Sequence, residues 1–161
     1  MESEIEFLVG EYSRVLDERH RLSLPEPLVG SLMAPQGRCL LVKERPGCLS
    51  LWSQAGWQEK LDAGLALVRG KIRAGKLEGR MHQVQMLGRL LSTRQSEVKL
   101  AGRGRLLVPE GFREFLGVEP GGEVAVIGAA VCIELWRPAA WLDYLNRRIP
   151  RFRRLFDNLS G

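Results

Sequence analysis

The sequence is poor in the residues from which metal centres and disulfide frameworks are built. Among 161 residues it has 2 histidines and 3 cysteines, and no two cysteines lie close enough for a CxxC motif. An odd number of well-separated cysteines argues against a disulfide framework, and so few ligands make a zinc site improbable. We therefore expect no metal, no cofactor and no disulfide.

Long apolar runs and catalytic constellations are missing as well. No run approaches the roughly 20 residues that a membrane span needs. The start, Met1-Glu2-Ser3-Glu4, lacks the basic region and apolar stretch of a signal peptide. No nucleophile and general base are spaced for catalysis. These absences predict a soluble, cytoplasmic protein that is not an enzyme and does not contact a membrane.

Positive charge is present, but it is unevenly placed. Residues 1–146 carry 19 Lys and Arg against 18 Asp and Glu, whereas residues 147–161 carry five Arg and one Asp. The stretch 69–94 is also basic. Arginine outnumbers lysine 19 to 5, a bias that suits bidentate recognition of phosphate or guanine and that genome base composition also produces. Local placement, rather than overall charge, decides which residues meet phosphates.

The main organising feature is an internal duplication. Without any gap, residues 10–61 and 94–145 share 15 identities in 52 positions when the chain is shifted by 84. The repeat predicts two similar units of about 55 residues, each only marginally stable alone and therefore expected to pack against the other or against another subunit. The matching pairs include Arg21 and Arg105, Pro25 and Pro109, Cys48 and Cys132, Trp52 and Trp136, and Trp57 and Trp141.

Each unit is predicted to have the order β-β-α-β-β-α. Ser53 and Pro138 are suited to begin helices, and Gly117 is suited to end one. Apolar spacing between the units predicts two further helices, broken near residues 70–75, and Pro150 should end the helix before it. The expected elements are strands 5–16, 21–24, 39–44 and 48–52 with helix 28–33, then strands 96–100, 105–108, 123–128 and 131–136 with helix 111–116.

Two arginine-bearing turns, at residues 16–25 and 100–109, are the candidate functional elements. We interpret both as hairpins with an arginine at the tip, Arg21 in the first copy and Arg105 in the second. Such a side chain can reach a guanine edge or a phosphate. Arg19 and Arg103 are better placed for phosphates. The alternative is structural: Arg21 pairs with Asp17 only to hold the turn.

Other conspicuous residues favour packing or solvation over chemistry. The four tryptophans recur with the repeat, so we expect core packing rather than base stacking. Cys48 and Cys132 lie in apolar strands as small hydrophobic residues. His82 is expected to be solvated. The five arginines of residues 147–154 suit a solvated tail, with nonspecific phosphate contact as the second interpretation.

Taken together, several motifs resemble the MraZ family. These are the Asp-x-x-x-Arg turn at Asp17 and Arg21, the following Leu-Ser-Leu-Pro, and Leu51-Trp52 before Trp57, arranged in a duplicated unit over roughly residues 5–146. The resemblance implies an α+β fold of two tandem AbrB-like repeats in a swapped-hairpin barrel with a helical connector. The implied division is repeat 5–61, connector 62–93, repeat 94–146 and basic tail 147–161.

The same resemblance implies a function. It is that of a nucleoid-associated transcriptional regulator of a division and cell-wall gene cluster, which forms a ring-shaped homo-oligomer and binds promoter repeats in double-stranded DNA. It nominates Asp17, Arg21 and Arg105 as DNA contacts, beside Arg19 and Arg103. The family turn, Asp-x-x-Gly-Arg, has Gly where the first copy has His20 and Asp where the second copy has Ala101. These departures motivate an alternative, an assembly or protein-interaction module with weakened or lost DNA binding.

Overall fold

The computed structural model describes residues 7–30 and 38–161, and it has an α+β fold, which confirms the predicted class. Neighbouring strands are antiparallel throughout the described residues. The elements are β1 (Leu8–Val15), β2 (Arg21–Ser23), α1 (Glu26–Val29), β3 (Arg38–Arg45), β4 (Cys48–Ser53), α2 (Gln54–Arg73), η2 (Glu78–Arg80), α3 (Met81–Arg94), β5 (Gln95–Lys99), β6 (Arg105–Leu107), α4 (Glu110–Leu116), β7 (Glu123–Ala130), β8 (Ile133–Trp136), α5 (Pro138–Arg148), η3 (Ile149–Arg151) and α6 (Phe152–Ser160).

The strands form a six-stranded sheet in the order β1-β7-β8-β4-β3-β5 and a separate two-stranded ribbon of β2 and β6. This pairing corrects the expectation of two simple hairpins. β1 pairs with β7 instead of β2, and β5 pairs with β3 instead of β6. Within the described residues the ladders form an open sheet and a ribbon, so the expected barrel is not confirmed.

The pairing also follows the 84-residue offset. In the ribbon, Arg21 lies opposite Leu107, and Ser23 lies opposite Arg105. Adding 84 to one member of each pair and subtracting 84 from the other converts the first pair into the second. The β4–β8 ladder behaves in the same way, because it pairs Leu49 with Leu135 and Leu51 with Ile133. Corresponding strands of the two halves therefore face each other in both ladders.

Apolar side chains on the two faces of the sheet fill separate layers. The larger core lies between one face of the sheet, the ribbon, α1 and α4, and it contains Leu22, Leu106 and Leu116 at 1% exposure or less. On the opposite face, Trp52 and Trp57 pack with Val42 and Cys132 near the start of α2, and Trp136 packs under α5. Strand alternation produces this division, since successive side chains point to opposite faces.

Local signals placed several helix ends correctly. The Ser53 hydroxyl accepts a hydrogen bond from the Gly56 N–H at the start of α2, at 3.1 Å. Pro138 is the first residue of α5, and Gly117 ends α4 with the left-handed φ of 76°. The break between α2 and α3 falls at residues 74–77, next to the predicted interval, where Gly75 has a φ of 72°.

Several predicted bounds differ from the structure. β1 is described from Leu8, and residues 5 and 6 of the predicted strand lie outside the described residues. α1 spans Glu26–Val29 instead of 28–33, and residues 31–33 also lie outside. β8 begins at Ile133 instead of 131, because the chain turns sharply there. Ala130 has a φ of 65°, and the Val131 N–H donates to the Ala129 carbonyl at 2.7 Å.

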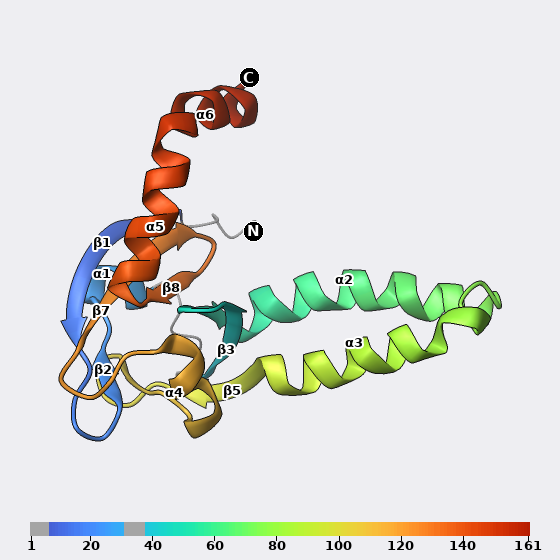
Figure 1. Cartoon of the computed structure of the whole chain (residues 1–161), viewed down its shortest axis with the longest axis horizontal. Coiled ribbons are helices and arrows are strands. Elements are labelled where there is room, and N and C mark those ends of the chain that lie inside the picture. Colours follow the sequence, from blue (N-terminus) through green and yellow to red (C-terminus); the bar gives the residue numbers. More distant parts are fainter. Residues whose placement is uncertain (1–6, 31–37) are drawn as a thin grey trace.

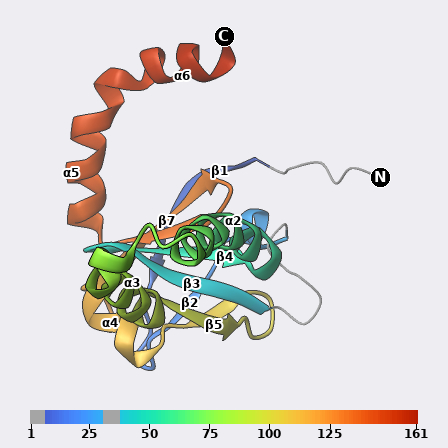
Figure 2. The same cartoon turned by 90° about the vertical axis from the view of Figure 1, so that its right-hand side faces the viewer.

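Two helical extensions leave the body of the molecule. α2 and α3 run side by side as a long arm, while α5 and α6 extend in a different direction (Figures 1 and 2). The last 15 residues are largely helical: α5 ends just before Pro150, as predicted, and α6 follows η3. Among the described residues, none of the helices is both long enough and apolar enough to span a membrane.

Candidate nucleic-acid interface

The β2–β6 ribbon has one buried face and one exposed face. Leu22 and Leu106 lie opposite each other and are fully buried. Because side chains alternate along a strand and opposite residues share a face, Arg21, Ser23, Arg105 and Leu107 occupy the other face. The two arginines are diagonal neighbours there, which places their Cα atoms roughly 7–8 Å apart. The pairing thus brings together two residues separated by 84 positions in the sequence.

The first turn is held by the carboxylate of Asp17. One oxygen accepts hydrogen bonds from the backbone N–H groups of Arg19 and Arg21, both at 2.8 Å. The other accepts from Arg21 Nε at 2.9 Å. Asp17 and Arg21 keep side-chain exposures of 43% and 41%. The structural role proposed for this pair therefore exists, yet it uses only one of the five guanidinium N–H donors.

The second turn is closed by backbone groups alone. Ala101 N–H donates to the Arg105 carbonyl, and Arg105 N–H donates to the Ala101 carbonyl, both at 2.9 Å. The Arg105 N–H therefore bonds a carbonyl, where the Arg21 N–H bonds the Asp17 side chain. No side-chain hydrogen bond or ion pair joins the Arg105 guanidinium to another residue in the described part of the chain. Arg105 is exposed and lies close to the backbone of Gly102.

The residue before each arginine has a positive φ. It is 59° at His20 and 100° at Gly104. A Cβ on Gly104 would lie 3.0 Å from both methyl carbons of Val29, so glycine is required there by conformation and by space. His20 has a left-handed conformation, and its buried Nδ1 has no hydrogen-bond partner among the described residues. The first turn therefore accommodates a side chain before its arginine, whereas the second requires glycine at that position.

The turns lie at opposite ends of the ribbon. The Val108 N–H donates to the His20 carbonyl at one end, and the Leu24 N–H donates to the Gly104 carbonyl at the other, both at 2.9 Å. Arg19 and Arg103 belong to these turns and are exposed. Along the ribbon the arginines therefore follow the order Arg19, Arg21, Arg105 and Arg103. The structure places all five predicted site residues, including Asp17, on the ribbon or in its two turns.

Hydrogen bonding keeps Asp17 charged. The pKa of its carboxyl is lowered, first by the hydrogen bond from the Arg21 backbone N–H and then by those from the Arg19 backbone and the Arg21 guanidinium, with partial desolvation opposing them. A carboxylate that accepts several N–H bonds favours its ionised form. Asp17 therefore remains an acceptor at neutral pH and keeps Arg21 Nε directed toward it.

Comparison with known proteins identifies the type of chain. Residues 92–156 match the model of the family described as "MraZ protein, putative antitoxin-like". The "Transcriptional regulator MraZ" of Syntrophomonas wolfei is 25% identical over 151 residues, which cover 94% of this chain and 95% of the relative. That of Heliobacterium modesticaldum is 28% identical over 155 residues and covers the same shares, 94% and 95%. The resemblance to the MraZ family is confirmed.

A third relative, the "Transcriptional regulator MraZ" of Thioalkalivibrio sulfidiphilus, is 29% identical over 128 residues, or 79% of this chain and 77% of the relative. These MraZ relatives are named as regulators and not as enzymes, in agreement with the expectation that this chain is not an enzyme. The family model covers the second arginine turn. The alignments with the relatives extend over most of the chain.

The other conspicuous residues of this MraZ-like chain lie away from the ribbon's exposed face. Trp52, Trp57 and Trp136 are buried, and so are the three cysteines. His82 is exposed on α3. Within residues 7–30 and 38–161 no three His, Cys, Asp or Glu side chains gather to hold a metal ion.

Sequence reasoning missed two members of the exposed ribbon face, Ser23 and Leu107. Leu107 is 52% exposed although it is apolar. The signal was available, because Arg21-Leu22-Ser23 and Arg105-Leu106-Leu107 each place a buried leucine between two outward positions. What sequence did not supply was the pairing of these two segments with each other.

Proposed function

We propose that this chain is a sequence-specific DNA-binding transcriptional regulator that acts as a homo-oligomer. The observation that carries the proposal is the placement of Arg21 and Arg105 on one exposed face of the β2–β6 ribbon. Arg19 and Arg103 lie in the turns at the two ends of the ribbon. The printed names of the MraZ relatives support a regulatory role, and the ribbon provides a surface with which DNA could be contacted.

The dimensions of the ribbon suit the major groove of DNA. That groove is about 12 Å wide and admits a two-stranded β-ribbon. In the proposed complex Arg21 and Arg105 enter the groove, where a guanidinium can donate two hydrogen bonds to guanine O6 and N7. Arg19 and Arg103 meet the phosphates on either side and fix the register. Asp17 does not contact the bases in this arrangement; it orients Arg21.

The Asp17–Arg21 pair is compatible with this role. Asp17 accepts from Nε, which leaves the two terminal amino groups of Arg21 for a ligand. A guanidinium held in one orientation loses less conformational freedom when it binds. The pair therefore supports DNA recognition as well as turn stability.

Exposed apolar surface supports the proposed self-association. α6 exposes Phe152, Leu155, Phe156 and Leu159 along one side, at 57–80%. The arm exposes Leu67, Met86 and Leu90, each above 50%. Soluble monomers rarely leave such continuous apolar faces uncovered. In a ring of several copies these faces would be covered, and repeated ribbons would bind repeated DNA sites with avidity of about 10²–10⁴.

We further propose the finer organisation that the MraZ resemblance implies. Residues 5–61 and 94–146 form two AbrB-like repeats whose strands exchange partners, residues 62–93 connect them, and residues 147–161 extend the second. The β1–β7 and β3–β5 ladders, each joining one half to the other, support such an exchange. The target is a division and cell-wall gene cluster, a proposal that rests on the resemblance alone.

Selection of bound duplexes from random DNA would test the proposed function. The full chain, held at moderate salt, is expected to enrich a short sequence present in repeated copies. Recovery of no sequence above the competitor level would contradict sequence-specific binding. Light scattering on the same sample should give a mass of several protomers, and a monomeric mass would contradict the oligomer.

A second function is favoured by a specific observation. Arg21 is already engaged by Asp17, and the second turn has Ala101 where the first has its carboxylate. An assembly or protein-interaction module with weakened DNA binding would also expose the apolar faces of α6 and the arm. A stable oligomer that shows no preference for any selected duplex would favour this alternative.

A further inference from the structure

A hollow of about 440 Å³ lies where the turn between β3 and β4 meets α5, outside the ribbon and its turns. Four of the side chains that line it are arginines, and one is a carboxylate, Asp143. Two aromatic residues, Trp136 and Tyr144, also line the hollow. We call this site the arginine hollow. Its arginines are Arg45, Arg137, Arg147 and Arg148.

Close packing between the β3–β4 turn and α5 builds the arginine hollow. The Arg137 N–H donates to the Gly47 carbonyl at 2.8 Å. Gly47 has a φ of 82°, and a Cβ there would lie 2.9 Å from the Ala140 Cβ. Glycine is therefore required both for the turn and for the close approach of α5. The hollow is a product of the packed fold and not a gap beside a loose loop.

Aromatic rings support two of the guanidinium groups. Arg45 lies over Trp136 and Tyr144, at 5.7 and 5.1 Å from the ring centroids, and Arg148 lies over Tyr144 at 5.5 Å. The ring faces attract the cations but accept none of the N–H groups at the edge of the guanidinium plane. Those edge donors are the groups that bind carboxylate or phosphate oxygens in a bidentate manner.

The lining of the arginine hollow has an excess of positive charge. Arg147 forms an ion pair with Asp143 at 3.3 Å, which leaves three arginines without a carboxylate among the lining residues. Glu134 interacts electrostatically with Arg45, but it does not line the hollow, and its carboxylate accepts a hydrogen bond from Trp136 Nε1. Three adjacent cations in a concave surface favour an anion with more than one negative charge.

The duplication supplies an internal control for two of these arginines. Positions 84 residues earlier keep the tryptophans, since Trp52 and Trp57 correspond to Trp136 and Trp141 and each pair is in contact, but Lys60 stands where the second half has Tyr144. The arginines within the matched segments are not kept, since Arg45 and Arg137 correspond to Ala129 and Ser53. Arg147 and Arg148 lie beyond residue 145, where the matched segment ends. The shared packing therefore does not need Arg45 or Arg137.

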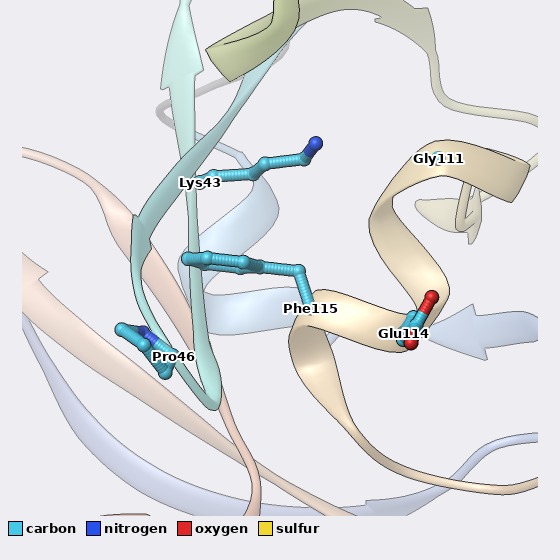
Figure 3. A pocket seen from close by; sticks show the side chains of 5 residues that line it. All are labelled: Lys43, Pro46, Gly111, Glu114 and Phe115. Atoms are coloured by element: carbon cyan, nitrogen blue, oxygen red, sulfur yellow. The ribbon is translucent and has the colours of Figure 1, made fainter. Parts of the chain in front are cut away.

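A neighbouring hollow beside the same β3–β4 turn has no excess of positive charge. It has a volume of about 390 Å³, shares Pro46 with the arginine hollow and lies against α4 (Figure 3). Its charged residues are one lysine, Lys43, and one glutamate, Glu114. Lys43 lies over the rings of Phe112 and Phe115. This hollow is balanced in charge and carries no comparable set of donors.

We propose that the arginine hollow binds a small phosphate-bearing anion of nucleotide size through Arg45, Arg137 and Arg148. Its volume falls in the range of small-molecule sites, about 300–1,000 Å³. The shared chemistry is the phosphate group, which either a free nucleotide or the backbone of DNA can supply. The concave shape favours the free nucleotide. None of the lining residues belongs to the ribbon or its turns, so this site goes beyond the proposed DNA contact.

Isothermal titration of the full chain with ATP and with inorganic pyrophosphate would test the proposal. Both probes are expected to bind saturably, and Arg45→Gln combined with Arg148→Gln should weaken binding by at least about tenfold, because each removes charge-assisted hydrogen bonds. Lys43→Gln in the neighbouring hollow is the matched control, and the ribbon variant Arg21→Ala/Arg105→Ala should bind both probes like the parent.

Several results would overturn the proposal. The first is no saturable binding of either probe by the parent chain. The second is equal binding by the parent and by the single variant Arg148→Gln, whose exposed side chain can be replaced without disturbing the core. The third is weakened binding of duplex DNA by the Arg45/Arg148 variant while neither probe binds, which would assign the phosphate to the DNA backbone.

Discussion

The two arginine turns reach similar positions by different chemistry. At the first turn a carboxylate holds the backbone and the Arg21 side chain together, and His20 occupies a left-handed position. At the second, three backbone hydrogen bonds, two of which have counterparts at the first turn, and two glycines of positive φ close the turn, and Arg105 has no carboxylate partner in the described chain. The difference separates two needs of such a turn, its backbone conformation and the orientation of its arginine.

This comparison predicts unequal roles in DNA binding. Arg21 is oriented before it meets a ligand, whereas Arg105 must lose its side-chain freedom on binding, a cost of about 0.5–1.5 kcal/mol. The first turn should therefore contribute more to specificity. The second should contribute through charge and through its place on the same ribbon face.

The largest expected effect comes from removing both arginines. Arg21→Ala combined with Arg105→Ala should weaken binding to a selected DNA site by more than about a hundredfold, because each bidentate contact is worth about 1–3 kcal/mol. Fluorescence anisotropy with labelled duplex measures this. Arg89→Ala on the exposed arm is the control, and an unchanged affinity of the double variant would show that the ribbon is not the DNA contact.

Substitutions at the residue before each arginine, Gly104 and His20, should have the next largest effect, a change in the stability of the fold. Gly104→Ala forces a side chain into a φ of 100° and against Val29, so it should lower the free energy of unfolding by about 1–3 kcal/mol. His20→Gly relieves a left-handed residue and should be neutral or stabilising by up to about 1 kcal/mol. Chemical denaturation compares both with the parent, and equal effects would contradict the difference between the turns.

Much of this local chemistry could be predicted from the sequence. The cap at Ser53 and the stop at Gly117 follow from the residue and its neighbours. The duplication predicted which segments correspond. The partner of each strand could not be predicted in the same way, because β2 pairs with β6 across 84 residues and only the folded core fixes that register.

The arginine hollow was missed for a similar reason. Arg147 and Arg148 were assigned to a basic tail, and Arg45 was not singled out, since these residues are far apart in sequence. Comparing the two copies for differences in charge, as well as for identities, would have detected Arg45, which matches Ala129.

Exchanging the carboxylate between the turns should have a smaller effect on DNA affinity. Asp17→Ala frees Arg21, and Ala101→Asp gives Arg105 the partner that it lacks. The first should weaken binding and the second strengthen it, each by about three- to tenfold, because the gain is limited to one immobilised side chain. Anisotropy titrations on the same duplex compare the two, and changes of the same sign in both variants would contradict the orienting role of the carboxylate.

The smallest expected effect is the loss of stability from the Asp17 carboxylate as the pH is lowered. The lowered pKa of Asp17 means that its contribution to stability is fully present above the ordinary value of 3.8 and is lost as pH falls through the lowered pKa. The melting temperature of the parent should exceed that of Asp17→Asn above that pH, and the two should converge below it. A difference in melting temperature that stays constant with pH would contradict stabilisation of the turn by the ionised Asp17 carboxylate.

The most direct measurement places a probe between the two arginines. Ser23 lies opposite Arg105 on the exposed ribbon face, and the native cysteines Cys39, Cys48 and Cys132 are buried, so Ser23→Cys can be labelled selectively with a photo-crosslinker. The account predicts efficient crosslinking to bound duplex from Ser23→Cys and little from Ser92→Cys on the exposed side of the arm. Crosslinking from the arm but not from the ribbon would contradict it.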